Sequence, residues 1–242
     1  MATHRGIQIS GAGFAVAGKT ILSDLNLNLL ERRIGIVGRN GSGKTTLLRL
    51  IAGLIAPSTG VVRIAGIDPA KDRRAMLTQL GILFQNPDHQ ILFPTVGEEL
   101  AFGLRQMGQT ETDAKIAVRA FLHHEGRSHW EMAATHTLSQ GQRHYLCLMA
   151  VVLMAPRIVL LDEPFAGLDL PTQTRLSRKL AALEQQLIII SHDPAAVSGC
   201  DRVIWLEAGR VQADGAADPV LQAFGKTMAV LGGQDADTDL SC

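Results

Sequence analysis

A glycine-rich segment, GRNGSGKTT at residues 38–46, constrains the fold more than any other stretch of this sequence. It matches the pattern G-x-x-x-x-G-K-[ST], a loop whose backbone amides surround a phosphate. An apolar run at 34–37 precedes it, and Leu47, Leu48 and Ile51 form one apolar face of the helix that follows. A strand, a phosphate loop and a helix in this order predict an α/β domain built on a largely parallel sheet.

Each residue type in this loop has its own part in binding an anion. Glycines allow the backbone to curl so that successive N–H groups face one phosphate, and the helix N-terminus adds roughly half a positive charge. Lys44 is expected to neutralise the β- and γ-phosphates, and the Thr45 hydroxyl to bind Mg²⁺. A plain glycine-rich turn would not need all the fixed positions with these flanks. We therefore expect a nucleoside triphosphate to bind at Gly38, Arg39, Asn40, Gly41, Ser42, Gly43, Lys44, Thr45 and Thr46.

Further apolar runs are expected to form strands, and helical patterns lie between them. These runs are at 61–64, 158–161, 187–190 and 203–206. The alternation breaks between about 87 and 155, where the apolar spacing is helical, so we expect a helical subdomain inserted into the α/β core. One domain is expected to cover residues 1–225, and the glycine- and aspartate-rich tail at 226–242 is expected to be disordered.

Composition excludes several classes of function. The 23 basic and 23 acidic side chains give a formal net charge of zero, which offers no electrostatic basis for nucleic acid as the main partner. The longest apolar run, at 146–155, is far shorter than the ~20 residues of a membrane-spanning helix, and the first residues lack the apolar core of a signal peptide. Cys147, Cys200 and Cys242 show no paired or metal-binding spacing, which favours a reducing cytoplasm.

Two acidic residues at the end of an expected buried strand suggest hydrolysis. In LLDEP at 160–164, Asp162 and Glu163 are neighbours, so their side chains point to opposite faces of the strand. Asp162 suits a Mg²⁺ contact, whereas Glu163 suits holding and deprotonating the attacking water. His192 follows the strand at 187–190 and is expected to donate to a γ-phosphate oxygen from the same sheet edge. Solvated acids and a structural histidine are the simpler interpretation, but beside a phosphate loop the catalytic one is favoured.

The segment LSQGQ at 138–142 indicates a second anion site. Ser139 can cap a helix, and the N–H groups around Gly141 would face an anion beyond the helix N-terminus. An ordinary helix cap is the alternative. Because this segment lies in the helical insertion, far along the chain from the phosphate loop, the two are not expected to reach the same nucleotide.

These motifs, in their order and spacing, resemble the ATP-binding-cassette (ABC) ATPases over roughly residues 5–225, with GLD at 167–169 included. The resemblance implies a P-loop NTPase core with antiparallel β elements beside the parallel sheet, and Mg²⁺-dependent ATP hydrolysis. It also implies a head-to-tail dimer, a homodimer first and a heterodimer as the alternative, in which the signature motif LSQGQ of one chain closes over the nucleotide of the other. The residues that would lie at this shared site are Ser139, Gln140, Gly141 and Gln142 on the γ-phosphate and Asp169 at the dimer seam.

Two positions depart from the family pattern. Gln140 stands where the first glycine of Leu-Ser-Gly-Gly-Gln is usual, and we expect it to be tolerated, with Ser139 and Gly141 the sensitive residues. The aromatic residue that stacks on adenine is expected at 14–16, where either Phe14 fills the role or Val16 leaves it empty.

The process that the ATPase drives is expected to be membrane transport through a permease on another chain. ABC proteins of DNA repair and chromosome structure are split by coiled coils or carry zinc modules, and those of translation carry two cassettes. None of these features occurs in this sequence. A small P-loop kinase or GTPase is disfavoured because no Asn-Lys-x-Asp motif is present and the carboxylate pair with its distal histidine would go unexplained.

Residues 85–103, QNPDHQILFPTVGEELAFG, indicate the type of transporter. Gln85 matches the family glutamine that reaches Mg²⁺ and the attacking water. The stretch after it closely resembles the ATPases of energy-coupling-factor (ECF) uptake systems, in which a short extra helix contacts the transmembrane subunit. Asp88 and either Glu98 or Glu99 would then pair with arginines of that subunit.

The ECF resemblance implies an ATPase dimer, a transmembrane coupling subunit and a separate substrate-binding membrane subunit, with the ATPases peripheral to the cytoplasmic face of the membrane. Such systems import vitamins or transition-metal ions. Biotin uptake is the nearest resemblance, although no individual residue carries that choice. A generic ABC importer or exporter is the alternative, in which residues 86–90 only cap a short helix and turn the chain.

Overall fold

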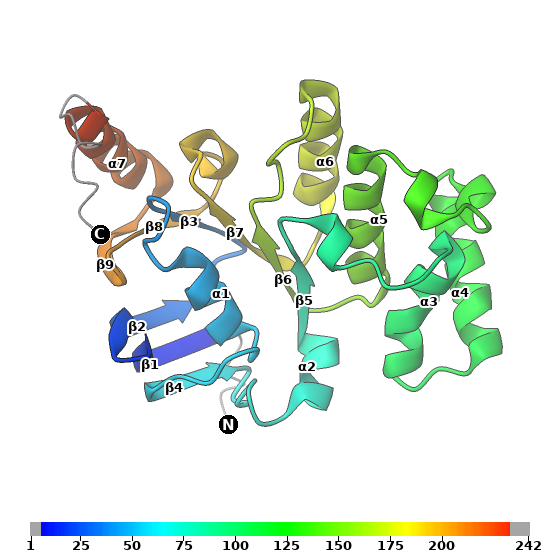
Figure 1. The fold of residues 1–242 in the computed structure, drawn as a ribbon, viewed down its shortest axis with the longest axis horizontal. Coiled ribbons are helices and arrows are strands. Elements are labelled where there is room, and N and C mark those ends of the chain that lie inside the picture. Colours follow the sequence, from blue (N-terminus) through cyan, green and yellow to red (C-terminus); the bar gives the residue numbers. More distant parts are fainter. Residues whose placement is uncertain (1–5, 233–242) are drawn as a thin grey trace.

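The computed structural model describes residues 6–232 of the chain (Figure 1). One sheet has the strand order β5-β6-β7-β3-β8-β9, in which neighbouring strands from β5 to β8 are parallel and β9 runs antiparallel to β8. A separate antiparallel sheet has the order β2-β1-β4. The expected α/β fold, with a mainly parallel sheet and antiparallel additions, is confirmed. The strands are β1 (Ile7–Val16), β2 (Lys19–Leu29), β3 (Arg33–Val37), β4 (Thr59–Ile64), β5 (Leu80–Leu83), β6 (Ile158–Asp162), β7 (Gln186–Ser191), β8 (Arg202–Glu207) and β9 (Arg210–Gly215).

The central strands are apolar throughout because both faces of their sheet are covered. In β6, Ile158 and Leu160 belong to a core shared with β1, β2, β4 and α1 (Lys44–Ile51). Val159 and Leu161 belong to a second core, on which α5 (Gln140–Leu153), α6 (Leu170–Ala182) and α7 (Ala217–Gly232) pack. A strand buried on both sides leaves only its ends for polar side chains, so the carboxyl edge of this sheet is where a polar site can form.

The helices divide into two groups. Helices α3 and α4 lie with α5 at one end of the molecule, away from the antiparallel sheet (Figure 1). They share a third apolar core and come between β5 and β6, where the helical subdomain is expected. The helices are α1 (Lys44–Ile51), α2 (Arg73–Gln79), α3 (Val96–Gln106), α4 (Glu111–His124), α5 (Gln140–Leu153), α6 (Leu170–Ala182) and α7 (Ala217–Gly232), with 3₁₀ turns η1 (Pro87–His89), η2 (Ser128–Trp130), η3 (Thr135–Thr137) and η4 (Pro194–Val197).

Helix α5 belongs to both groups. Leu146 and Met149 face the core of α3 and α4, whereas Cys147 and Leu148 face the core under the six-stranded sheet. Such a helix joins the two parts of the molecule along its length. Within residues 6–232, no helix has the length and apolar character needed to cross a membrane.

The predicted disorder of the tail is wrong for residues 226–232, which continue helix α7 to Gly232. Val220 and Phe224 are buried in the second core, Met228 packs against it, and the ring of Phe224 meets Trp205 edge-on. These apolar residues recur every four positions, a helical spacing that continues past Gly225. Residues 233–242 lie outside the described part of the chain.

Candidate nucleotide-binding site

A cavity of about 670 Å³ at the carboxyl edge of the six-stranded sheet gathers the predicted catalytic residues and most of the phosphate loop. This volume is in the usual range for a small-molecule site. Because β3, β6 and β7 are parallel neighbours, the residues that follow them meet at one edge. The lining comprises Lys19, Thr20, Ile21, Asn40, Gly41, Gly43, Lys44, Thr45, Thr46, Gln85, Asp162, Glu163, His192 and Ala208.

The phosphate loop folds around the amine of Lys44. Its Nζ atom donates to the carbonyl oxygen of Gly38 at 2.7 Å and to that of Arg39 at 2.9 Å. Burial lowers the pKa of Lys44 from its usual value, and the carboxylates of Glu163 and Asp162 oppose this shift. The cation therefore lies between the loop and the two acidic residues, where it can compensate the charge of a phosphate.

Two glycines of the loop are required by local geometry. A Cβ atom at Gly38 would lie 2.1 Å from the carbonyl oxygen of Leu206 in β8. Gly43 caps α1 with a φ of 102°, a conformation that other residues rarely adopt. Ser42 is buried beside them, and its hydroxyl has no hydrogen-bond partner among the described residues. The loop therefore packs directly against β8.

Asp162, the last residue of β6, is only 5% exposed. Burial and then the neighbouring Glu163 raise the pKa of Asp162, while Lys44 and a hydrogen bond from Thr45 oppose the shift. With Gln85, these residues place oxygen-bearing side chains on the wall of one cavity, the donor type that Mg²⁺ prefers. In the described part of the chain, no group of three His, Cys, Asp or Glu side chains forms a separate metal site. The residues present thus fit a Mg²⁺ ion that also contacts bound phosphates.

Glu163 follows β6 in a strained conformation, with a φ of 49°. A non-glycine residue held there costs about 1–3 kcal/mol, which suggests a functional constraint. Its carboxylate accepts hydrogen bonds from the Ser191 hydroxyl and the His192 backbone N–H, each at 2.8 Å. The Nδ1 atom of His192 also lies 2.8 Å from the carboxylate. The end of β7 thus orients the acid, and Glu163 and His192, both predicted at this sheet edge, are in direct contact.

The connection after β5 places Gln85 at the same cavity, where its side chain is exposed. Gln90 stabilises this connection: its side-chain amide donates to the Ile82 carbonyl at 3.2 Å and accepts from the Phe84 N–H at 3.1 Å. Asn86 caps η1 by accepting from the backbone N–H two residues later at 2.9 Å. The local capping role expected for this polar segment is therefore present, and it gives the chain beyond Gln85 a defined course.

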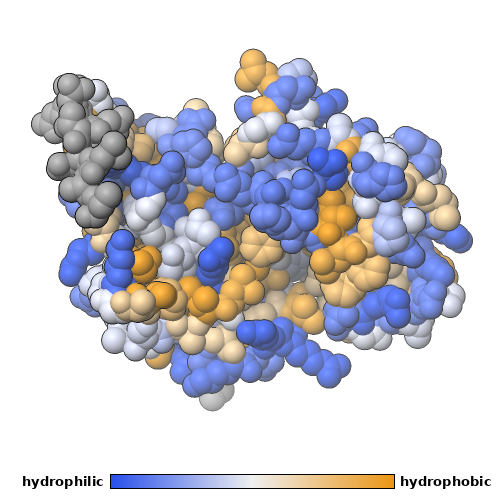
Figure 2. Space-filling view, viewed as in Figure 1, coloured by the Kyte–Doolittle hydropathy of each residue, from blue (hydrophilic) through white to orange (hydrophobic). Residues whose placement is uncertain are grey.

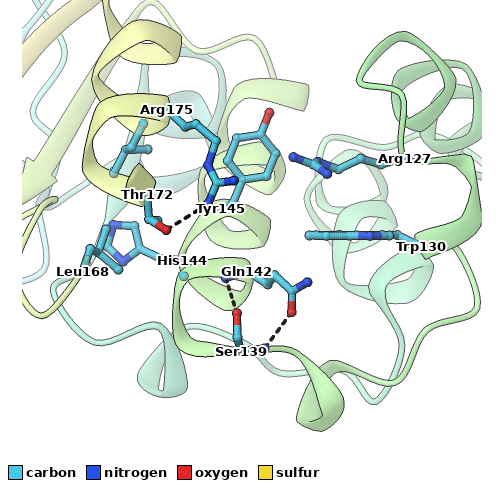
Figure 3. A pocket seen from close by; sticks show the side chains of 11 residues that line it. Arg127, Trp130, Ser139, Gln142, His144, Tyr145, Leu168, Thr172 and Arg175 are labelled. Atoms are coloured by element: carbon cyan, nitrogen blue, oxygen red, sulfur yellow. Dashed lines mark hydrogen bonds between the residues drawn. The ribbon is translucent and has the colours of Figure 1, made fainter. Parts of the chain in front are cut away.

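The LSQGQ segment lies at a second cavity, of about 230 Å³ (Figure 3). Ser139 and Gln142 cap α5 reciprocally: the Ser139 hydroxyl accepts from the Gln142 N–H at 3.3 Å, and the Gln142 side chain accepts from the Ser139 N–H at 2.8 Å. Beside them, Arg127 stacks between Trp130 and Tyr145, 4.7 Å from each ring centre. One chain thus carries the two predicted anion sites at separate cavities. The second lining comprises Arg127, Trp130, Ser139, Gly141, Gln142, His144, Tyr145, Leu168, Thr172, Arg175 and Leu176.

Gln140 and Asp169 line neither of these two cavities. The side-chain nitrogen of Gln140 lies 3.1 Å from the place that a Cβ on Gly167 would take, so this residue packs against its own chain. Asp169 caps α6 by accepting from the Thr172 N–H at 2.9 Å, and hydrogen bonds from Thr172 lower the pKa of Asp169. Both residues therefore lie where the start of α5 meets the start of α6.

The position of Gln140 leads to a first prediction. Gln140→Gly is expected to leave ATP turnover within about twofold of the unchanged chain, because its amide end meets Gly167 and no cavity. Ser139→Ala is expected to lower turnover about tenfold, since it removes a helix cap and a hydrogen-bond donor to an anion. Steady-state release of inorganic phosphate measures both. A large gain of activity in Gln140→Gly would instead mean that this glutamine impairs the site.

Two carboxylates expected to meet a membrane partner are engaged within the chain. Asp88 Oδ1 lies 2.9 Å from Arg143 Nε in an ion pair. Glu99 is buried and accepts from the backbone N–H groups of residues 92 and 93 at 2.8 and 2.9 Å. The expectation is wrong for Glu99, because its carboxylate supports the turn before α3. Glu98 is exposed.

Four lining residues belong to no motif that sequence inspection could find. Lys19, Thr20 and Ile21 come from the start of β2, and Ala208 from the turn between β8 and β9. Phe14 does not join them: it lines a neighbouring hollow with Thr59 and packs against the first core. Val16 is 54% exposed. Because this hollow shares Thr20 with the nucleotide cavity, the choice between Phe14 and Val16 for the adenine contact stays a prediction.

Comparison with known proteins identifies the family. The ABC transporter family model matches residues 22–166. The biotin transport ATP-binding protein BioM of Rhodobacter capsulatus is 49% identical over 88% of this chain and 92% of its own length, and BioM of Rhizobium etli is 36% identical over 91% and 96%. The solved structure of cbiO1 from Clostridium perfringens, part of the ABC transporter complex cbiONQ, matches with a TM-score of 0.77 at 28% identity over 94% of both chains. The chain therefore belongs to the ABC transporter family, as one of its ATP-binding, ATP-hydrolysing proteins.

Proposed function

We propose that this chain is the ATPase subunit of an ECF uptake transporter that imports a vitamin, biotin first, with a transition-metal ion as the alternative substrate. One observation carries the proposal: Gln85 lines the nucleotide cavity, and the residues directly after it form η1 and the exposed Leu92. A movement of Gln85 on ATP binding or hydrolysis would therefore need to pass through only a few residues to alter the protein surface at η1 and Leu92. The 49% identity to a protein named for biotin transport supports this choice of substrate.

Glu163 is proposed as the general base that activates the attacking water. Its carboxylate lines the nucleotide cavity and is oriented there by hydrogen bonds from the Ser191 hydroxyl and the His192 backbone N–H. Because His192 Nδ1 lies against this carboxylate, Nε2 is the ring nitrogen that can meet a γ-phosphate oxygen. Thr45, Asp162 and Gln85 would hold Mg²⁺, which supplies positive charge to the phosphates when bound.

A second copy of the chain is proposed to complete each nucleotide site. The phosphate loop and LSQGQ line separate cavities, so one chain offers two half-sites, each for a different bound nucleotide. Ser139 and the N-terminus of α5 suit a γ-phosphate held by another chain. A homodimer would have two complete sites, and a heterodimer with a related ATPase is the alternative. ATP would hold the two chains together, and hydrolysis would release them.

A transmembrane coupling subunit is proposed to dock on η1 and the segment before α3. In Figure 2, hydrophobic residues gather where Figure 1 places this segment, and Leu92 is 67% exposed. Phe93 packs against Phe102 of α3, with ring centres 5.1 Å apart. Exposed apolar patches of this kind mark interaction sites, and the exposed Glu98 suits an arginine at their edge. Docking there would hold the chain at the cytoplasmic face of the membrane, while a separate membrane protein binds the substrate.

Uptake of labelled biotin by cells that depend on this chain tests the proposal. Lys44→Met is expected to lower ATP-driven biotin uptake about tenfold or more, because the loop loses its buried cation. Lys71→Met is the matched control, since this lysine is exposed and pairs with Asp68 at the surface. If Ni²⁺ or Co²⁺ uptake falls and biotin uptake does not, the chain serves a metal importer. If neither falls, biotin and these metal ions are not the substrates, and another vitamin or a generic ABC transporter is favoured.

A further inference from the structure

Helix α5, which begins in the LSQGQ segment, is joined to the turn η1 by two contacts on one of its faces. Arg143 Nε lies 2.9 Å from Asp88 Oδ1. One helical turn later, Cys147 Sγ lies 3.9 Å from the carbonyl oxygen of Pro87, and both of these residues are buried. Residues four positions apart share a helix face, so η1 is held along the first two turns of α5.

The guanidinium of Arg143 also reaches the backbone of the LSQGQ segment. Its Nη1 atom donates to the carbonyl oxygen of Leu138 at 2.7 Å. Its Nε atom is shielded from solvent and makes no hydrogen bond within the described residues, so its contact with Asp88 is an ion pair without hydrogen-bond geometry. The same peptide unit is held from its other side, because the Ser139 N–H donates to the Gln142 side chain at 2.8 Å. Arg143 and Gln142 thus bind opposite sides of the Leu138–Ser139 peptide unit, which positions Ser139.

This series of contacts, from Leu138 through Arg143 to Asp88, continues to the nucleotide cavity. Gln85 lines that cavity and lies three residues before Asp88 in a segment that Asn86 and Gln90 brace by hydrogen bonds. These hydrogen bonds hold the residues of this turn in fixed positions relative to one another. A displacement of Gln85 is therefore expected to carry Asp88 with it, and through Asp88 to shift the guanidinium that holds Leu138.

We infer that Arg143 is a positioning residue for Ser139 and that Asp88 orients it, so that each chain's own nucleotide cavity controls the anion site it offers to its partner. The inference rests on the proposed function, in which Ser139 meets a phosphate held by a second copy. Arginine suits this role because its planar guanidinium can donate to the Leu138 carbonyl from one nitrogen while another lies against the Asp88 carboxylate, whereas lysine is a point charge. Since Asp88 is 60% exposed, the pair adds little to folding, and its effect is on association.

ATP-driven dimerisation in a Glu163→Gln background tests the inference. Static light scattering gives the ATP concentration at half-maximal dimer, and Asp88→Asn is expected to raise that concentration about tenfold. ATP affinity of the dilute monomer is expected to stay within about twofold, and Tm to be unchanged, because the phosphate loop is untouched. Asp88→Glu is expected to restore most of the association. Arg143→Lys is expected to match Asp88→Asn, and the double variant to be no worse than either.

A similar ion pair elsewhere in the helical part provides the matched control. Arg119 Nε lies 2.8 Å from Glu131 Oε1, and among the described residues no side-chain hydrogen bond or ion pair is found between this pair and LSQGQ. Glu131→Gln is therefore expected to leave dimerisation unchanged. Equal dimerisation of Asp88→Asn and Glu131→Gln would overturn the inference and leave the proposed function standing. A fall in Tm without rescue by Asp88→Glu would also overturn it. Absence of any ATP-driven dimer in Glu163→Gln alone would overturn both.

Discussion

Glu163→Gln is expected to lower ATP turnover about 10²–10⁴-fold while ATP binding stays intact. The amide has the size of the carboxylate, and its oxygen can still accept from the Ser191 hydroxyl or the His192 N–H, so the strained turn is expected to persist. An amide cannot take a proton from water. The variant should therefore accumulate as an ATP-bound dimer, which size-exclusion chromatography with ATP and Mg²⁺ detects.

Glu184→Gln is the control for this substitution, because it makes the same chemical change at an exposed position between α6 and β7. Its turnover is expected to stay within about twofold of the unchanged chain. Turnover that is also unchanged in Glu163→Gln would remove Glu163 from the role of base. Loss of ATP binding in Glu163→Gln would instead assign this carboxylate to holding the nucleotide.

Lys44→Met is expected to weaken ATP binding about 10–100-fold, the range for losing hydrogen bonds from a charged donor. Lys44 is only 7% exposed, and its amine donates to the carbonyl oxygens of Gly38 and Arg39 beside the cavity. Methionine keeps the apolar stem in place and removes the positive charge together with its N–H donors. Isothermal titration calorimetry with a non-hydrolysable ATP analogue measures the change.

Two further variants separate charge from packing at this position. Lys71→Met removes an exposed lysine and is expected to bind the analogue normally. Lys44→Ala removes the stem as well as the charge and is expected to bind no better than Lys44→Met. An intact affinity in Lys44→Met together with a lost one in Lys44→Ala would show that packing of the stem, and not the amine, supports the nucleotide.

The nucleotide cavity was largely predictable because its residues follow apolar strands directly. Asp162 and His192 come together since β6 and β7 are parallel neighbours, and that pairing follows from the alternation of strands and helices. The loop at Lys44 is local in sequence, so its motif contains its whole geometry. The motifs did not predict residues of the β1–β2 hairpin such as Thr20. Their place at the cavity depends on how the antiparallel sheet packs on the six-stranded sheet.

Partners of individual side chains were the least predictable feature. Asp88 and Glu99 both belong to the segment 85–103. Asp88 is exposed and forms an ion pair with Arg143 of α5, whereas Glu99 is buried and accepts hydrogen bonds from two backbone N–H groups. Sequence spacing does not distinguish these environments, because burial is decided by which neighbours cover the segment. The same limit applies to α7, where local composition obscured an apolar face that Phe224 buries against Trp205.

The place of β3 in the sheet has a consequence for how the chain is made. The strand that leads into the phosphate loop lies between β7 and β8, and the Arg33 N–H at its start donates to Asp201, 168 residues later. On the ribosome, the whole motif emerges long before the strands that hold it, because domains are completed only as their last segments appear. A nascent chain that ends at residue 155 would carry every residue of the loop but lack β6, β7 and β8, which lie beside it in the sheet. We therefore expect full nucleotide affinity to arise only late in translation.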